Sequence, residues 1–362
     1  MRRVSLYLLY LIVVCAVFLE IVFRVLPVSD SLEIYPVDED NPIIHFKENR
    51  ALTLQTGFDF SHVVEKRVNN FGFLTNTTFD EGRSSKKKRV VVIGDSFVEA
   101  VQVANEDTFH GLLHKNKSDI EVYPLGASGS PLSQYLAFAG FAERILRPDN
   151  YVFLIIKNDF DESWLKYKNA PSFHYFDDEE RLVRRDYEPS GIKRLFRASA
   201  FVRYLYLDLK IEQRVMAIWE SFNTKSNLKG SNILTVNELI DEDQELERLR
   251  HMLRAVEIFL NGLREIVGDK PVLLVLDGNL SAIYERYSET RPRESHEDQA
   301  FHYLQHLATE QPDTNVLDLH PVFYQEWIRE QERFDYSYDR HWSENGHRIA
   351  ARAILASGFL DD

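Results

Sequence analysis

The chain has 362 residues, 44% of them hydrophobic, which is enough for one large domain or two small ones with a sizeable core. Its formal net charge of −14 speaks against a nucleic-acid partner, because binding a polyanion requires clustered lysine and arginine. Cys15 is the only cysteine, which excludes a disulfide framework and a cysteine-based zinc site. The histidines form no convincing ligand set, and nothing in the sequence requires a metal or a cofactor.

The first predicted element is an apolar helix. Residues 4–23 are interrupted only by Ser5 and Glu20, and at about 1.5 Å per residue they can cross a hydrocarbon core of about 30 Å. Two arginines precede the run, so the positive-inside tendency predicts a cytoplasmic N-terminus and an exported, periplasmic remainder. We therefore predict that residues 1–26 form a single-pass anchor in the inner (cytoplasmic) membrane. A cleaved signal peptide is the alternative, although its apolar core should be shorter and a small-x-small site should follow.

Residues 27–87 have a mixed composition, with proline, asparagine and acidic side chains, then an alternating segment and a turn at 69–72. This pattern predicts a stalk and a small cap segment. A basic run at 86–89 ends the region. Because it stands just before an apolar strand, we interpret it as a solvated linker, although charge runs can also bind phosphate.

Strand patterns alternate with helical patterns over residues 88–362, which we predict to be one domain. Continuous β-branched runs are typical of strands buried on both faces of a parallel sheet. Their alternation with helices predicts right-handed crossovers and an α/β fold, a three-layer α/β/α sandwich around a parallel sheet of about five strands. The predicted strands are 90–94, 120–124, 151–157, 271–276 and 315–319, and the predicted helices include 133–146 and 244–267.

The first of these strands stops at Gly94-Asp95-Ser96. In open α/β sheets, ligands bind beyond the carboxyl ends of the strands, and a glycine there permits a sharp turn that presents the Ser96 hydroxyl. Ser96 is therefore a candidate nucleophile. The alternative is a plain turn followed by a helix N-cap, since all three residue types favour such positions.

The strand rhythm lapses between residues 161 and 243, which predicts an insertion in the domain. Aromatic residues crowd its start, soon after Asn158. Trp164 and Tyr167 are candidates for substrate binding, because rings in this place can stack against a sugar or shape an acyl pocket. Ordinary packing within the insertion is the alternative.

A serine nucleophile requires a base and an acid that orients the base. Near the C-terminus, Asp339 and His341 precede an apolar helical pattern, so both side chains can project into a crevice and Asp339 can fix the imidazole tautomer. The competing pair is Asp318 and His320, which strand alternation places on one face. No serine motif lies near that pair, so the sequence favours His341.

Four short blocks within residues 88–362 resemble the SGNH (GDSL) hydrolase superfamily. The blocks are Gly94-Asp-Ser-Phe97, Leu125-Gly-Ala-Ser-Gly-Ser130, Ile155-Ile-Lys-Asn-Asp159 and Asp339-x-His341-Trp-Ser. The resemblance implies a flavodoxin-like sandwich in which Ser96 is the nucleophile, His341 the base and Asp339 the orienting acid. It also implies an oxyanion hole formed by the N–H groups of Ser96 and Gly129 and by the side chain of Asn158.

The sequence departs from the superfamily pattern in two places. The orienting acid commonly stands three residues before the histidine, a place held here by Tyr338, whereas Asp339 stands two before it. This shorter Asp-x-His-Trp form is similar to the branch that acts in O-acetylation of exopolysaccharides such as alginate. In the third block, Lys157 takes the place of the usual glycine.

These observations favour a membrane-anchored serine hydrolase or acyltransferase that cleaves or transfers small O-acyl (acetyl) esters on an extracytoplasmic glycan. The expected partners are an acylated glycan or small ester and, through the N-terminal helix, the membrane. A lipase, thioesterase or lysophospholipase is the first alternative. The second is a catalytically silent binding or assembly component that keeps the fold.

Overall fold

The computed structural model describes residues 2–191, 197–212, 214–216, 235–337 and 339–361. At its centre is a sheet of five parallel strands in the order β4-β3-β5-β8-β9. The strands are β3 Lys88–Gly94, β4 Ile120–Gly126, β5 Asn150–Ile155, β8 Val272–Leu276 and β9 Thr314–Asp318. All five predicted strands are present, with ends shifted by one or two residues. The predicted α/β fold with a parallel sheet is therefore confirmed.

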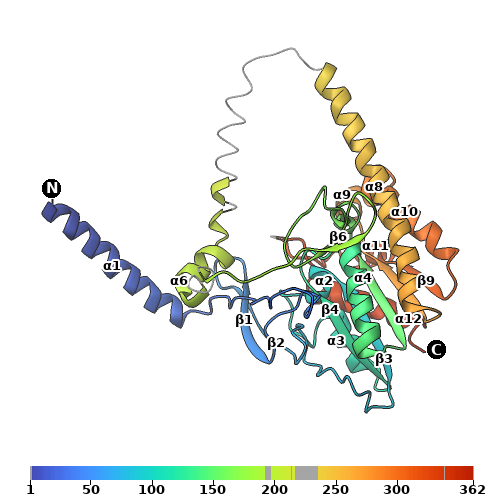
Figure 1. The fold of residues 1–362 in the computed structure, drawn as a ribbon, viewed down its shortest axis with the longest axis horizontal. Helices are drawn as coiled ribbons and strands as arrows, with labels where there is room; N and C mark the ends of the chain where they lie inside the picture. The colour runs from blue at the N-terminus through green and yellow to red at the C-terminus, as the bar shows by residue number, and fades with distance from the viewer. Residues whose placement is uncertain (1, 192–196, 213, 217–234, 338, 362) are drawn as a thin grey trace.

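Helices cover both faces of this sheet (Figure 1). Consecutive residues of β3 point to opposite faces, so Val91 and Ile93 belong to one core and Val90 and Val92 to the other. The first core is closed by α4 Leu132–Phe141, α8 Thr235–Val267 and α10 His296–Thr309. The second is closed by α3 Phe109–Asn116, α9 Leu280–Arg286, α11 Leu319–Glu330 and α12 Glu344–Ala356. This burial on both faces explains why β3 has no polar alternation.

The segment before the sandwich contains an antiparallel pair, β1 Arg50–Thr56 and β2 His62–Val68. The outward-facing residues of β2 are polar or exposed, while Val64, Lys66 and Val68 are buried. A small separate core lies beneath the pair; its members are Phe46, Leu52, Leu54, Val68 and Leu74.

After β5 the chain forms two short 3-10 helices, Lys157–Asp159 and Asp161–Ser163, and then the antiparallel pair β6 His174–Phe176 and β7 Leu182–Arg184. The helix α6 Ala200–Arg203 continues directly into a π-helical turn, Tyr204–Asp208. The helix predicted over 244–267 begins earlier, at Thr235. Residues 192–196, 213 and 217–234 of the predicted insertion lie outside the described residues.

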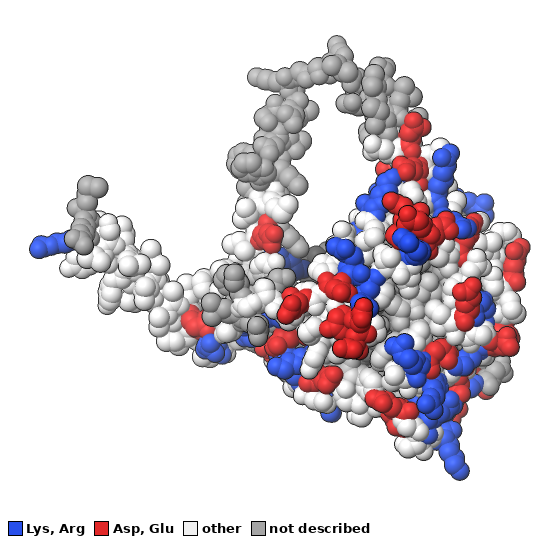
Figure 2. All heavy atoms as spheres, viewed as in Figure 1, with Lys and Arg blue, Asp and Glu red and all other residues white. Residues whose placement is uncertain are grey.

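The N-terminal helix α1, Arg2–Val25, projects from the rest of the molecule (Figure 1). Its middle carries no acidic or basic side chain (Figure 2). Of the helices in the described ranges, it alone is long and apolar enough to cross a membrane, a test that an N-terminal signal sequence also passes.

Candidate active site

The turn after β3 presents Ser96 at the carboxyl edge of the sheet. A Cβ atom on Gly94 would lie 2.5 Å from Val98 Cγ2 and 3.2 Å from the Leu154 carbonyl oxygen, so this close approach requires glycine. Asp95 caps the short helix α2, Ser96–Glu99, by accepting a 3.0 Å hydrogen bond from the N–H of Phe97. The Gly-Asp-Ser sequence therefore forms a capped helix start, as its residue types favour, and it exposes the serine hydroxyl at the same time.

His341 lies against this serine. Its Nε2 atom is 2.9 Å from Ser96 Oγ, which is a hydrogen-bond distance. The neighbouring indole of Trp342 is buried and donates from Nε1 to Asp277 Oδ1 at 3.1 Å. The ring of Phe97 packs 4.9 Å from the imidazole, centroid to centroid. Packing on both sides of the loop before α12 thus holds the imidazole over the serine.

Asp339 stands on the far side of the imidazole. Its Oδ2 atom is 3.5 Å from His341 Nδ1, an ion-pair distance at which the buried Nδ1 makes no hydrogen bond, and its Oδ1 accepts the backbone N–H of His341 at 3.1 Å. Burial alone would raise the pKa of Asp339, but hydrogen bonds from His341 and Gln102 lower it overall. Burial would lower the pKa of His341, yet the carboxylates of Asp339, Asp95 and Glu99 together outweigh burial and raise that pKa, with Asp339 the largest of the three.

A second carboxylate reaches the serine. Asp95 Oδ2 lies 2.9 Å from Ser96 Oγ, so the hydroxyl has two acceptors within reach, Asp95 and the imidazole. Asp95 is buried, and this burial raises its pKa. Sequence reasoning treated Asp95 only as a turn residue, and its contact with the hydroxyl depends on the turn geometry.

Gly129 and Asn158, the predicted oxyanion donors, come from the loops after β4 and β5. Gly129 has a φ of 82°, a conformation that favours glycine. The Asn158 side chain donates from Nδ2 to Glu162 at 3.1 Å. Lys168 ties the two loops together by donating to the Gly129 carbonyl at 2.9 Å and to Glu162.

The turn that carries Asn158 is braced by a buried carboxylate. Asp159 Oδ2 accepts the N–H of Ile156 at 2.8 Å and the hydroxyl of Tyr135 at 2.9 Å. Burial raises the pKa of Asp159 well above its ordinary value. The last residue of the third block is thus a structural member of the turn.

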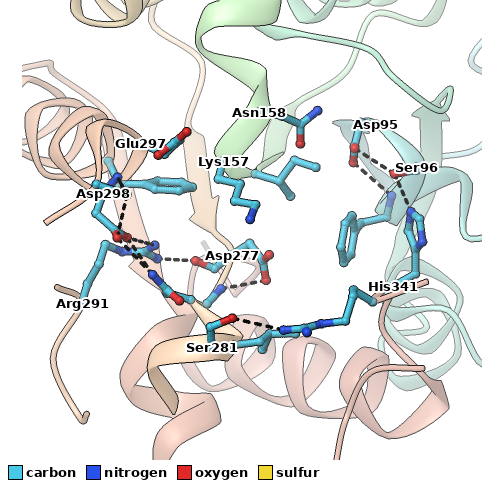
Figure 3. Close-up of a pocket in the computed structure, with 18 of the residues that line it drawn as sticks. Asp95, Ser96, Lys157, Asn158, Asp277, Ser281, Arg291, Glu297, Asp298 and His341 are labelled. Atoms are coloured by element: carbon cyan, nitrogen blue, oxygen red, sulfur yellow. Dashed lines mark hydrogen bonds and ion pairs between the residues drawn. The ribbon is translucent and has the colours of Figure 1, made fainter. Parts of the chain in front are cut away.

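Ser96, Gly129, Asn158, Asp339 and His341 line one pocket of about 700 Å³. Figure 3 shows Ser96 and His341 at one end, Asp277 near the middle, and Arg291 with Asp298 at the opposite end. The apolar side chains of the lining are few: Phe97, Ile156, Leu280 and Phe301. The remaining lining residues are Asp95, Lys157, Asp277, Gly278, Asn279, Ser281, Arg291, Ser295, Glu297, Asp298 and Arg340.

Asp277 is a pocket residue that sequence reasoning missed. It follows β8 directly, and its Oδ1 accepts the N–H of Gly278 at 2.7 Å as well as the Trp342 indole. Burial raises the pKa of Asp277 to about 7. Its position just past a strand end was the one signal available in the sequence.

The structure does not bring Trp164 and Tyr167 to the pocket, which corrects the expectation that they form a substrate platform. Trp164 is 5% exposed, packs in the core against Phe176, and donates from Nε1 to the His251 carbonyl at 2.9 Å. The Tyr167 hydroxyl lies 2.8 Å from His251 Nδ1. Both rings therefore attach the start of the insertion to α8, and packing, the alternative reading, accounts for them.

The competing acid–base pair, Asp318 and His320, makes other contacts and does not line the pocket that holds Ser96. His320 is fully buried: its Nδ1 accepts the N–H of Asn279 at 3.1 Å, its Nε2 donates to the Ser288 carbonyl at 3.1 Å, and burial lowers its pKa. Asp318 forms an ion pair with Arg291 at 2.9 Å. In the part of the chain that the structure describes, no group of three or more His, Cys, Asp or Glu residues is arranged to hold a metal ion.

No family model and no curated protein sequence matches the chain. Similar solved structures include a member of the lipolytic protein G-D-S-L family from Veillonella parvula (9% identity, TM-score 0.36, covering 74% of this chain and 97% of that one). TesA is another, with 13% identity and a TM-score of 0.40 over 75% of this chain and 98% of that one. A third is a catalytic variant of Axe2, an acetylxylan esterase from Geobacillus stearothermophilus, with 14% identity and a TM-score of 0.38 over 74% of this chain and 93% of that one. At such low scores and identities these likenesses do not assign an activity, so the function is inferred from the chain's own residues.

Proposed function

We propose that this chain is a membrane-anchored serine esterase or O-acyltransferase that cleaves or transfers small acyl groups, such as acetyl, on an extracytoplasmic glycan. The observation that carries the proposal is the 2.9 Å contact between Ser96 Oγ and His341 Nε2 in a pocket that Gly129 and Asn158 also line. Nucleophile and base within hydrogen-bond reach, with an acid behind the base, form the arrangement required for acyl transfer.

The proposed reaction has two steps. Ser96 Oγ attacks the ester carbonyl as His341 Nε2 takes its proton, and the N–H groups of Ser96 and Gly129 with the Asn158 amide stabilise the oxyanion. His341 then returns the proton to the departing alcohol, which leaves an acyl-Ser96 ester. In the second step His341 deprotonates water or a sugar hydroxyl as it attacks the acyl group, and then returns that proton to Ser96 Oγ as the acyl–serine bond breaks.

The lining of the pocket supports a small acyl group on a hydrophilic carrier. About 700 Å³ is within the usual range for small-molecule sites. Apart from four apolar side chains, its lining is polar or charged, and Asp277 and Lys157 offer hydrogen bonds suited to hydroxyl groups. A long acyl chain would leave such groups desolvated and unpaired, which costs free energy.

A chain-length series of p-nitrophenyl esters tests this preference against the lipase alternative. We expect turnover on the acetyl ester and a steep loss beyond short chains. Equal or greater activity on long acyl chains would favour the lipase or thioesterase alternative. An acetylated oligosaccharide, assayed with and without a second sugar as acceptor, then separates hydrolysis from transfer.

A fluorophosphonate probe tests whether the site is catalytic or silent. We expect covalent labelling of the wild-type chain and none of Ser96→Ala, because only an activated serine reacts with the probe. Labelling that persists in Ser96→Ala would refute the nucleophile assignment, and a wild-type chain that neither labels nor turns over esters would support the silent alternative.

Contacts at the end of α1 support an uncleaved anchor. Glu20 accepts hydrogen bonds from the Ser199 hydroxyl at 2.6 Å and from the N–H of Phe201 at 3.2 Å, at the start of α6. The ring of Phe23 packs on Phe201 and Tyr204 at centroid distances of 5.4 and 4.3 Å. The acidic residue in the apolar helix thus has a partner in the part of the chain that follows the anchor, which a discarded signal peptide would not require.

A further inference from the structure

The acid of the proposed triad is held by a residue distant from it in sequence. Gln102 Nε2 donates to Asp339 Oδ2 at 2.8 Å, a shorter contact than the 3.5 Å between the same oxygen and His341 Nδ1. Gln102 is 4% exposed and lies in the loop that follows α2. It is not among the residues that line the pocket, so its effect on chemistry has to act through Asp339.

The backbone of this loop is in turn held by β2. His62 Nε2 lies 2.6 Å from the Gln102 carbonyl oxygen. Lys66, four residues along the same strand and therefore on the same face, donates from Nζ to the carbonyls of Ala100 at 2.6 Å and Val103 at 2.7 Å. Lys66 is buried, and burial lowers its pKa to about 7. Two side chains of the N-terminal hairpin thus brace the loop that carries Gln102.

Local geometry at the C-terminal loop explains why such a brace is needed. Asp339 stands only two residues before His341, and Arg340 between them has a φ of 66°. One carboxylate oxygen is already used by the backbone N–H of His341 at 3.1 Å. The other oxygen must face Nδ1 of the imidazole, and Gln102 donates to that same oxygen.

We infer that Gln102 is a positioning residue that fixes the Asp339 carboxylate toward His341, and that the β1–β2 hairpin is part of the catalytic unit because it holds Gln102. This inference rests on the proposed function. It assigns a role to His62 and Lys66, which lie outside the sandwich domain that carries the triad.

The test is Gln102→Leu in the full chain, assayed on p-nitrophenyl acetate with fluorophosphonate titration of active sites. We expect kcat per titrated site to fall about 10–100-fold, the range typical of groups that orient a catalytic side chain, with KM little changed. The acidic limb of the kcat/KM profile should move to lower pH, because a displaced Asp339 raises the pKa of His341 less.

Asn105→Leu is the matched control. Asn105 is an equally buried amide nearby, and it donates to the Arg67 carbonyl at 3.2 Å and to Asn76 at 3.1 Å without contacting the triad. It should lower the melting temperature but leave kcat per titrated site and the acidic limb unchanged. An equal shift of the limb in both variants would reduce Gln102 to a structural role and overturn the inference.

A double-variant cycle provides a second readout. If Gln102 acts through Asp339, adding Gln102→Leu to Asp339→Asn should cause little further loss of kcat. If the two residues act independently, the fold-losses in kcat of the single variants should multiply in the double variant. Multiplying losses would overturn the inference. If Gln102→Leu yields no titratable sites, His62→Leu is assayed in its place. We expect the acidic limb of its kcat/KM profile to shift in the same direction by a smaller amount, and an unshifted limb would count against the inference. An inactive, unlabelled wild-type chain would refute the proposed function, whereas an active wild type with an unaltered Gln102→Leu profile would refute this inference alone.

Discussion

Replacing Asp339 by asparagine removes one negative charge from the proposed triad with almost no change of shape. In the wild-type chain, one oxygen accepts the N–H of His341 and the other faces both His341 Nδ1 and Gln102 Nε2. An asparagine has one oxygen for these two places. If its NH2 group faces Nδ1, donor meets donor and the imidazole is pushed toward the tautomer that cannot accept the Ser96 proton. If the NH2 group instead faces the backbone N–H of His341, the two donors repel and the amide is displaced from its place behind the imidazole.

The expected loss of activity in Asp339→Asn follows from the two roles of the carboxylate, which orients the imidazole and raises its pKa. General-base catalysis contributes about 10²–10⁴-fold, which at about 1.36 kcal/mol per factor of ten is about 2.7–5.4 kcal/mol of the barrier. We therefore expect Asp339→Asn to lower kcat per titrated site by about 10²–10⁴-fold. Since the carboxylate also raises the pKa of His341, its loss should lower that pKa.

The pH dependence has a definite sign. His341 acts as a base only when it is neutral, so kcat/KM rises with pH through the pKa of His341, and the wild-type midpoint should lie above the ordinary value of about 6.5. In Asp339→Asn the midpoint should lie at lower pH. The assay is hydrolysis of p-nitrophenyl acetate across the pH range, normalised by fluorophosphonate titration.

Asp335→Asn is the control for this experiment. Asp335 is also buried and close in sequence, but its carboxylate binds Arg333, Arg340 and the hydroxyl of Tyr284. It should lower the melting temperature and leave the acidic limb in place. Near-normal turnover by Asp339→Asn, together with a large loss in Asp335→Asn or Asp318→Asn, would refute the assignment of the acid.

Three further outcomes are expected. Asn158→Ala should lower kcat on the acetyl ester by about 10²–10³-fold, which raises the activation free energy by about 2.7–4 kcal/mol, with little change in KM. The reason is that an oxyanion donor acts mainly in the transition state, so an effect confined to KM would contradict this role. Lys66 has a folded-state pKa of about 7, below its unfolded value, so the folded chain binds fewer protons than the unfolded chain. The free energy of unfolding should therefore rise from pH 7 to 9 by up to about 1.4 kcal/mol per pH unit. Thermal unfolding should show a weaker rise in Lys66→Met, and the same pH dependence in both chains would count against the buried lysine. Cysteines replacing Phe23 and Phe201 in a Cys15→Ser chain should be joined in membranes by a bismaleimide crosslinker, and recovery of a shortened, soluble chain would instead indicate a cleaved signal.

Local patterns in the sequence determined the sheet and the serine–histidine end of the candidate site. The five strands were predictable because each is buried on both faces and therefore reads as a continuous apolar run. Ser96 and His341 were predictable because each stands at the junction of a strand or loop with a helix, where the preferences of glycine, serine and aspartate are strong.

Tertiary structure alone decided which side chains surround that serine and histidine. Nothing in the sequence near Gln102 indicates that it donates to Asp339, because the two residues meet only when the loop after α2 packs against the loop before α12. Trp164 belongs to an aromatic cluster of the kind that can bind a sugar, yet its ring lies in the core because α8 covers it. This contact joins segments that are far apart in the chain. Composition indicates what a side chain can do, and its surroundings depend on long-range packing that a local pattern does not encode.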